Sequence, residues 1–319
     1  MKKIMMLALT GALLSSTPVA SAASPYYPVA KDQHTAAGVY KDGKKVIAAK
    51  QSNETQPIQD VTSIKDTIFF TEYQSYEFEM ICERLDLMYQ LKMKKGTGKV
   101  QTLSQVSGYM GNIGNDGKQI YFVAAKNPYK GNLTRITADG KTKKTLVPDV
   151  EDFWYVKDHI YYMKKNTVYE FNKKTLKSNV IGLGKGKLRP TSYCLGGTIR
   201  AGENALIYRE KTTSKKASYI TYDYVGKKMK RFELNQFPLQ NEYIDPIRVL
   251  DVNSKRSEFI YDQGNLLLLN QKSKVLKTLL PENKIKQIGY TQAKTYESID
   301  AVKRKITYVK GTKRFMMSY

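Results

Sequence analysis

A short run of hydrophobic and aromatic residues recurs along the chain between residues 68 and 308. Such residues favour a pleated, half-buried strand, and polar turn residues flank each copy. Successive copies lie 40 to 53 residues apart, a period that suits a unit of four short antiparallel strands, so the pattern predicts six such units. The copies are Ile68-Phe69-Phe70, Ile120-Tyr121-Phe122, Ile160-Tyr161-Tyr162, Leu206-Ile207-Tyr208, Phe259-Ile260-Tyr261 and Ile306-Thr307-Tyr308.

The clearest unit covers residues 152–182, where polar turns separate four apolar segments. These segments are residues 153–156, 159–163, 167–171 and 178–181. Four strands joined in this way describe one blade of a β-propeller. A two-sheet sandwich of the same strands is the alternative, but it does not predict a period of this length. We therefore expect an all-β protein, a six-bladed β-propeller with four-stranded antiparallel blades.

The two ends of the repeat region suggest how the ring closes. After residues 306–309 the sequence holds one more apolar segment, residues 313–317, so the last blade is one strand short. Ahead of the first complete unit, two apolar segments flank the turn Asp42-Gly43. An N-terminal strand that completes the last blade would close the ring and cover an exposed strand edge.

The first 22 residues have the features of a secretory signal peptide. Lys2 and Lys3 precede an apolar run over residues 4–14, and the small residues Ala20-Ser21-Ala22 follow. A transmembrane anchor is the alternative, but it needs about 20 apolar residues. We expect a signal peptide at 1–22, a flexible arm at 23–37 and the propeller at 38–319. The mature protein is then secreted or associated with the cell envelope, and it contains no membrane span.

The chain has two cysteines, Cys82 and Cys194. In an oxidising compartment they could form one disulfide. The predicted ring places them far apart, which favours two unpaired, buried thiols.

One stretch carries a resemblance to known proteins. Residues 117–122, followed by residues 133–146, resemble one blade of the secreted bacterial β-propellers related to the low-density-lipoprotein-receptor-type (YWTD) and TolB-like propellers. Phe69-Phe70-Thr71-Glu72 occupies the place of the Tyr-Trp-Thr-Asp motif in conservative form. The resemblance covers about residues 38–319. It implies a role in binding or scaffolding rather than catalysis, and it supplies no catalytic residues.

Composition narrows the chemistry. The chain has 41% hydrophobic residues, which is ordinary for a globular protein, and it has only two histidines, His34 and His159. Zinc and copper sites usually draw on several imidazoles or thiolates, so a histidine-rich metal site is excluded. The sequence contains no G-x-S-x-G nucleophile motif. It therefore predicts no cofactor.

Three acidic residues lie close together in one connection between blades, namely Asp149, Glu151 and Asp152. Paired carboxylates can act in glycoside chemistry, and loop carboxylates can bind Ca²⁺. The alternative function is therefore a propeller enzyme that acts on a carbohydrate or lactone with these loop carboxylates. A solvated turn is the simpler interpretation of the three residues.

The strongest compositional feature is positive charge. The chain has 53 Lys and Arg against 29 Asp and Glu, a net charge of +24, which becomes +22 without Lys2 and Lys3. Lysines concentrate in the predicted hairpin turns, where they would attract polyanions through counterion release. The alternative is that turn lysines only keep the strands soluble and block edge pairing. Candidate polyanion-binding residues are Lys141, Lys143, Lys144, Lys164, Lys165, Lys173, Lys174, Lys227 and Lys228.

These features predict a monomeric, exported and non-catalytic binding or scaffold propeller. Its expected partner is an anionic polymer of the cell envelope or another exported protein. Sequence-specific recognition of nucleic acid is not expected, because the sequence contains no helix-turn-helix, zinc finger or aromatic RNA-binding motif.

Overall fold

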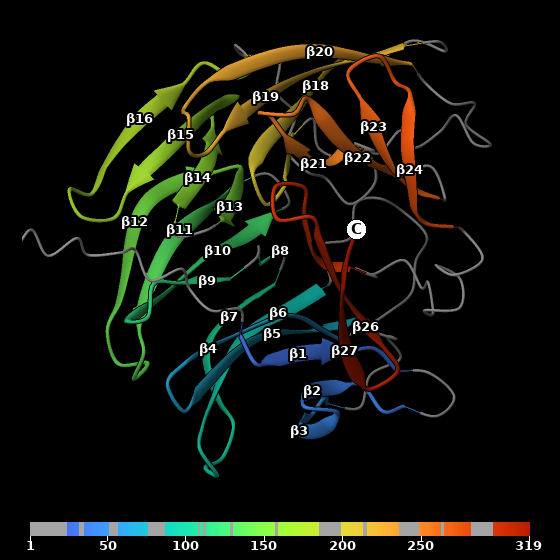
Figure 1. Cartoon of the computed structure of the whole chain (residues 1–319). Helices are drawn as coiled ribbons and strands as arrows, with labels where there is room; N and C mark the ends of the chain where they lie inside the picture. The colour runs from blue at the N-terminus through green and yellow to red at the C-terminus, as the bar shows by residue number, and fades with distance from the viewer. Residues whose placement is uncertain are drawn as a thin grey trace, which may run out of the picture.

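The protein is a β-propeller with seven blades, each an antiparallel sheet of three or four strands, arranged in chain order around a common centre (Figure 1). The computed structural model describes residues 24–31, 35–50, 57–75, 87–107, 109–110, 113–127, 130–156, 159–184, 199–212, 216–235, 249–262, 265–281 and 296–319. All strands and contacts below belong to these residues.

Blades 1 to 3 are formed by the N-terminal part of the described chain. Blade 1 contains β1 (Tyr26–Val29), β2 (Gly38–Lys41) and β3 (Lys44–Ala48). Blade 2 contains β4 (Ile58–Ile64), β5 (Thr67–Ser75), β6 (Leu87–Lys95) and β7 (Gln101–Ser107). Blade 3 contains β8 (Tyr109–Met110), β9 (Gly114–Asn115), β10 (Gln119–Asn127), β11 (Lys130–Thr137) and β12 (Lys143–Val150). Since β8 and β9 both pair with β10, together they occupy one strand position.

Blades 4 to 7 follow in chain order. Blade 4 contains β13 (Asp152–Val156), β14 (His159–Lys164), β15 (Thr167–Asn172) and β16 (Lys177–Ile181). Blade 5 contains β17 (Ile199–Ala201), β18 (Ala205–Thr212), β19 (Lys216–Asp223) and β20 (Met229–Asn235). Blade 6 contains β21 (Val249–Asn253), β22 (Glu258–Asp262), β23 (Leu266–Asn270) and β24 (Val275–Leu280). Blade 7 contains β25 (Tyr296–Asp300), β26 (Lys305–Lys310) and β27 (Lys313–Ser318).

The predicted number of six blades is wrong. Each of the six hydrophobic-aromatic copies is the second strand of a blade, in β5, β10, β14, β18, β22 and β26. The additional blade is the N-terminal sheet β1–β3, whose second strand is only four residues long and carries Val39-Tyr40 in place of the full pattern. A count of this pattern therefore misses one blade.

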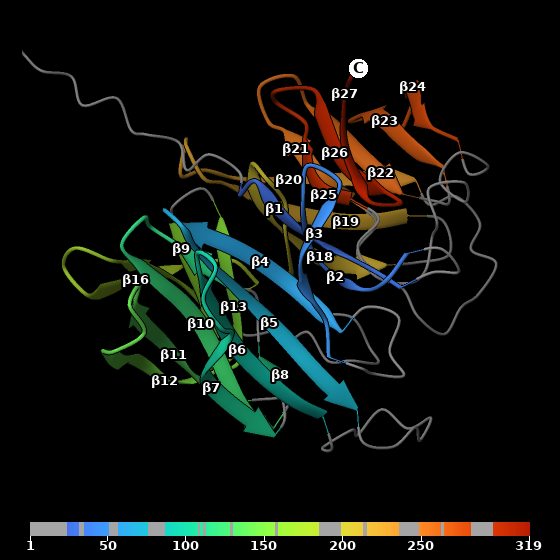
Figure 2. The same ribbon diagram turned by 90° about the horizontal axis from the view of Figure 1, so that it is seen from below.

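The predicted ring closure is also wrong in its detail. The N-terminal strands form a sheet of their own, and blade 7 keeps three strands instead of gaining a fourth. Blades 1 and 7 lie side by side (Figures 1 and 2) and are joined by side chains. The Tyr27 hydroxyl donates to Thr312 O at 2.8 Å, and the Arg314 guanidinium lies 4.5 Å from the Tyr27 ring centroid and donates to Ser24 O at 2.7 Å. Strand β1, with Tyr27 buried, falls within the segment for which a flexible arm is expected.

The hydrophobic core is divided among the interfaces between neighbouring blades. In β10, Ile120 and Phe122 pack in a cluster with blade 2, whereas Tyr121 and Val123 pack in a cluster with blade 4. Successive side chains of a strand point to opposite faces of its sheet. Both faces of a blade are buried, which is why these strands are continuous hydrophobic runs rather than an alternation of polar and apolar residues.

Several sequence predictions concern residues outside the described part of the chain. These are the signal peptide at residues 1–22, both cysteines and His34. Among the described residues, no helix has the length and apolar character needed to cross a bilayer.

Candidate functional site

The turns of the propeller divide between its two ends. In an antiparallel sheet, the turn from the first to the second strand and the turn from the third to the fourth lie at the same end. Backbone hydrogen bonds join the two turns in blades 2, 3 and 5: Gly96 N to Asp66 O at 3.0 Å, Ala138 N to Lys118 O at 3.2 Å and Tyr224 N to Asn204 O at 3.1 Å. In Figure 2 the arrowheads of β5 and β10 point away from this end, at which the C-terminus lies.

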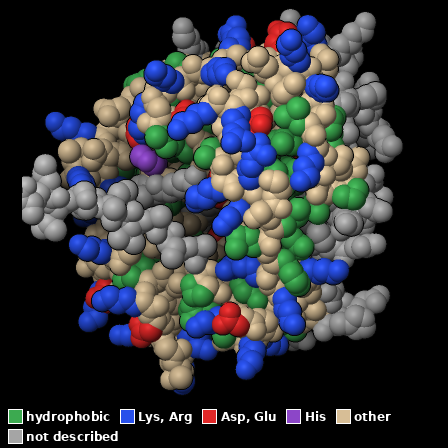
Figure 3. Space-filling view, viewed as in Figure 1, with side chains coloured by type: hydrophobic (Ala, Val, Ile, Leu, Met, Phe, Trp, Pro, Cys, Tyr) green, Lys and Arg blue, Asp and Glu red, His purple; other side chains and the backbone are tan. Residues whose placement is uncertain are grey.

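This end of the molecule is strongly basic. Its fully described turns are residues 65–66, 96–100, 116–118, 138–142, 173–176, 202–204, 224–228, 254–257, 271–274 and 301–304, which we call the basic face. They contain fourteen Lys and Arg and four Asp and Glu, a net charge of +10, and counting Asp223 and Asp300 at adjoining strand ends leaves +8. Figure 3 views this face and shows Lys and Arg spread across it with few acidic side chains.

The opposite end has fewer fully described turns, and it also carries lysines. The turns between second and third strands at residues 42–43, 165–166 and 311–312 contain one acidic residue, Asp42, and one basic residue, Lys165. The strand residues next to these turns add Lys41, Lys44, Lys164, Lys310 and Lys313, so lysines lie beside the described turns at both ends of the propeller.

Asp and Asn side chains fix the shape of the basic turns. Asp223 accepts hydrogen bonds from Val225 N at 3.0 Å and Gly226 N at 2.6 Å. Asn172 accepts from Lys174 N at 2.9 Å, and Asn270 accepts from Lys272 N at the same distance. Such side chains commonly bond the backbone two residues ahead in a turn. The turns are thus held by their own backbone and Asx residues, which leaves many of their lysine side chains exposed.

The nine lysines proposed from sequence do not form one group. Lys164 and Lys165 lie at the opposite end, while the other seven lie in or next to the basic turns. Four of the nine ammonium groups make contacts within the protein. Lys143 donates to Ser104 at 2.8 Å, and Lys164 donates to Pro148 O at 2.7 Å. Lys173 contacts Tyr155, and Lys227 pairs with Glu170. The side chains without a hydrogen bond or ion pair to any described residue are those of Lys141, Lys144, Lys165, Lys174 and Lys228.

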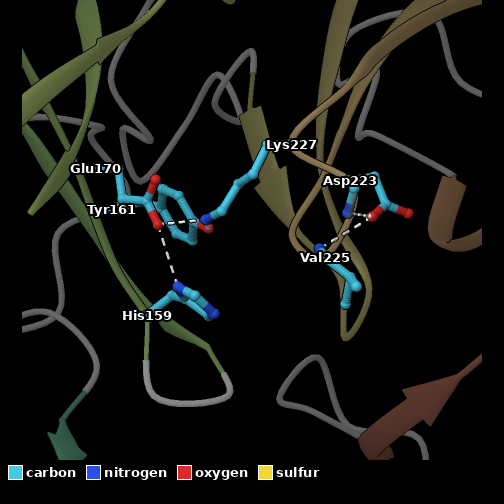
Figure 4. A network of polar contacts seen from close by, with 7 residues as sticks. His159, Tyr161, Glu170, Asp223, Val225 and Lys227 are labelled. Atoms are coloured by element: carbon cyan, nitrogen blue, oxygen red, sulfur yellow. Dashed lines mark hydrogen bonds and ion pairs between the residues drawn. The ribbon is translucent and has the colours of Figure 1, made fainter.

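Lys227 takes part in a polar network between blades 4 and 5 (Figure 4). Its ammonium group pairs with the Glu170 carboxylate and lies 5.7 Å from the Tyr161 ring centroid and 3.4 Å from the Tyr161 hydroxyl. The same carboxylate oxygen lies 3.1 Å from His159 Nδ1. Burial and the charge of Glu170 raise the pKa of Tyr161, so its phenol stays protonated. This network joins two blades, and it compensates the charge of Lys227.

A related contact joins blades 3 and 4. Lys173, in the equivalent turn of blade 4, donates to the hydroxyl of Tyr155 in its own blade at 3.2 Å and also lies near Tyr121 of blade 3. Its ammonium group lies 5.3 Å from the Tyr155 ring centroid and 5.9 Å from that of Tyr121. A desolvated lysine over an aromatic ring is favourable by about 0.5–2 kcal/mol. In these two neighbouring blades, a turn lysine therefore helps to hold its blade against the preceding one.

The three clustered carboxylates have structural contacts. Glu151 accepts hydrogen bonds from Lys165 N at 2.9 Å and Asn166 N at 3.0 Å, two residues with positive φ in the β14–β15 turn. Asp152 is buried and accepts from Phe153 N at 2.8 Å. Asp149 is exposed. The described residues contain no group of three or more His, Cys, Asp or Glu placed to hold a metal ion.

Sequence analysis missed the most unusual acidic residue, Asp251, which is fully buried in β21. It accepts hydrogen bonds from Asn204 N at 2.9 Å and Asn204 Nδ2 at 2.6 Å in blade 5, and from Ala301 N at 2.7 Å in blade 7. Burial raises the pKa of Asp251 to about 7, although these hydrogen bonds favour the charged form. The sequence does contain a signal for this buried carboxyl, because Asp251 interrupts the apolar run Val249-Leu250-Asp251-Val252.

The fold and the turns together define a β-propeller that carries a strongly basic face. No protein-family model matches the chain, and no curated protein sequence matches it. Among solved structures, dipeptidyl peptidase 4 of Porphyromonas gingivalis has a TM-score of 0.46 at 12% identity, over 90% of this chain and 49% of that one.

Two further solved structures have the same level of likeness. Puromycin hydrolase has a TM-score of 0.41 at 10% identity, over 81% of this chain and 45% of that one. An auxiliary nutrient binding protein from Bacteroides thetaiotaomicron has a TM-score of 0.37 at 10% identity, over 71% of this chain and 58% of that one. The chain spans about half the length of these three proteins. Its resemblance to YWTD and TolB-like propellers stays a prediction.

Proposed function

We propose that this protein is an exported binding propeller that associates with polyanions of the cell envelope through its basic face. The observation that carries the proposal is the net charge of +10 in the ten fully described turns of the basic face.

The arrangement of the lysines supports this role. The side chains of Lys141, Lys174 and Lys228 are exposed, and none has a hydrogen bond or ion pair to a described residue. These lysines belong to blades 3, 4 and 5, so a long polyanion can contact several blades at once. Each phosphate neutralised releases a condensed counterion, and the affinity therefore falls steeply with salt.

The contacts of the clustered carboxylates also support binding over catalysis. Glu151 and Asp152 already accept backbone hydrogen bonds, and Glu151 stabilises a strained turn. A general base or cation ligand needs lone pairs that are available to substrate or metal.

The proposal is tested with inorganic polyphosphate as the polyanion. One variant carries five Lys→Gln changes in or beside the turns of the basic face, at positions Lys141, Lys144, Lys174, Lys228 and Lys272. The matched control carries five Lys→Gln changes in or beside the turns at the opposite end, at positions Lys44, Lys45, Lys165, Lys310 and Lys313. Both variants lose the same net charge, so they differ only in where the charge is removed.

We expect the wild-type protein to lose most of its affinity between about 50 and 200 mM salt. The basic-face variant should bind polyphosphate at least about tenfold more weakly at low salt, because it has lost five phosphate contacts. The control should stay within about twofold of wild type. Equal loss in both variants, or no measurable binding by wild type, would overturn the proposal.

A further inference from the structure

The basic face also carries exposed aliphatic side chains. Four of its turns hold a large hydrophobic residue with much of its surface in water: Val100 at 44%, Leu176 at 43%, Val225 at 93% and Val302 at 52%. Each of these turns also contains at least one lysine. The remaining exposed large hydrophobic residues of the described chain lie on the outermost strands of their blades, namely Val180, Met229, Val275, Leu276, Phe315 and Met316.

A single exposed aliphatic side chain needs no explanation. What needs one is that four turns of the basic face each hold a large exposed aliphatic side chain together with a lysine. The fully described turns of the opposite end, residues 42–43, 165–166 and 311–312, contain none.

The β19–β20 turn holds Val225 rigidly in an outward position. Tyr224 is buried and donates its hydroxyl to Gly202 O at 3.1 Å, which anchors the base of the turn. Asp223 accepts the Val225 N–H at 3.0 Å (Figure 4). Because the turn is already ordered, insertion of Val225 into an apolar phase costs little further backbone entropy.

Leu176 gives an independent indication. It has a positive φ of 57°, in the left-handed region that favours Gly or Asn. Its N–H donates to Asn172 O at 2.8 Å, so the turn is well formed despite this conformation. A strained leucine with an exposed side chain contributes little to the folded core. Strain of this kind supports a functional role for the side chain.

We propose that the basic face docks on a lipid bilayer that contains anionic headgroups. The turn lysines contact the headgroups, and Val100, Leu176, Val225 and Val302 enter the boundary between headgroups and acyl chains. This inference rests on the proposed function and names the polyanion as a membrane surface. Lysines flanking aliphatic residues on one face are typical of proteins that lie in the interface, where apolar burial and electrostatic attraction add. A soluble polymer of phosphates gains nothing from the aliphatic side chains.

The test compares vesicles of pure phosphatidylcholine with vesicles that also contain phosphatidylglycerol, and uses polyphosphate in parallel. The aliphatic variant carries Val100→Ser, Leu176→Asn, Val225→Ser and Val302→Ser. Its matched control carries Val180→Ser, Leu276→Ser, Phe315→Ser and Met316→Ser on the outer strands. All eight positions are exposed, and polyphosphate binding reports whether each variant retains a functional fold.

We expect wild type to bind the phosphatidylglycerol vesicles and not pure phosphatidylcholine. The aliphatic variant should bind phosphatidylglycerol vesicles at least about tenfold more weakly, as expected for the loss of even one buried valine side chain. Its binding to polyphosphate and the vesicle binding of the control should both equal those of wild type. If the aliphatic variant binds these vesicles as tightly as wild type, the lipid inference fails while the proposed function stands.

A fluorescent variant supplies a second measurement. The chain has one tryptophan, Trp154, which is buried, so Val225→Trp adds a reporter at the tip of the turn. Its emission should shift to shorter wavelength on phosphatidylglycerol vesicles and stay unchanged with polyphosphate. An unchanged spectrum on vesicles that the protein binds would overturn the insertion of this turn. Failure to bind either polyanion would instead overturn the proposed function itself.

Discussion

Asp251 should make the stability of the propeller depend on pH in an unusual direction. It is fully buried in blade 6 and accepts hydrogen bonds from blades 5 and 7. Burial raises its pKa to about 7, whereas the carboxyl of the unfolded chain has its ordinary pKa near 4. Between these values the folded protein retains a proton that the unfolded chain has lost. The free energy of unfolding therefore falls as the pH rises through this window.

The size of the effect follows from the two pKa values. Within the window, the contribution of one group changes by about 1.4 kcal/mol per pH unit. With a folded pKa of about 7, the contribution of Asp251 falls by about 2 kcal/mol between pH 5 and pH 7, because the slope flattens near the folded pKa. Most ionisable carboxyls that form ion pairs act in the opposite direction, so the contribution of Asp251 must be isolated with a variant.

The assay is urea unfolding of wild type and Asp251→Asn at pH 5 and pH 7. The amide cannot titrate, and its NH₂ group replaces an oxygen that accepts hydrogen bonds from Asn204 Nδ2 and Ala301 N. We expect the variant to be less stable at pH 5 by about 1–3 kcal/mol because donors are left unpaired. The gap between the two proteins should narrow by about 2 kcal/mol at pH 7. An equal gap at both pH values would show that Asp251 does not hold a proton in the folded state, and the reasoning would be refuted.

Three further predictions concern contacts within and between blades. Glu72→Ala leaves the ammonium group of Lys92 buried without its carboxylate partner. The free energy of unfolding, measured by chemical denaturation, should fall by about 3–5 kcal/mol, and a fall below about 1 kcal/mol would contradict a buried ion pair. Gly114→Ala would place a Cβ within 1.9 Å of the Tyr155 ring, a clash that should cost about 1–3 kcal/mol of stability. The melting temperature should therefore drop by several degrees, and an unchanged value would argue against this contact between blades 3 and 4. Tyr27→Phe removes the hydroxyl that links the turns of blades 1 and 7, so the free energy of unfolding should fall by about 1 kcal/mol. Amide hydrogen exchange should become faster in these two blades alone, and an equal increase in all blades would count against a role in ring closure.

The sequence by itself determined the second strand of six blades and several of the turns. The Ile-aromatic pattern found the second strand of six blades, because a strand buried on both faces must be apolar at successive positions. Turns such as Asp42-Gly43 followed from residues that tolerate positive φ. It also placed the lysines in turns, since the polar segments between strands are local features of the chain.

Only the tertiary structure decided the number of blades and the distribution of charge. The N-terminal sheet is a blade because Tyr27 and Arg314 join segments almost 290 residues apart, and no local pattern encodes that contact. Which lysines share an end depends on how every strand pairs with the next. The pKa of Asp251 likewise depends on burial between three blades. Local propensity depends on residues that are close along the chain, whereas the distribution of charge, burial and ring closure depend on residues that are close in space.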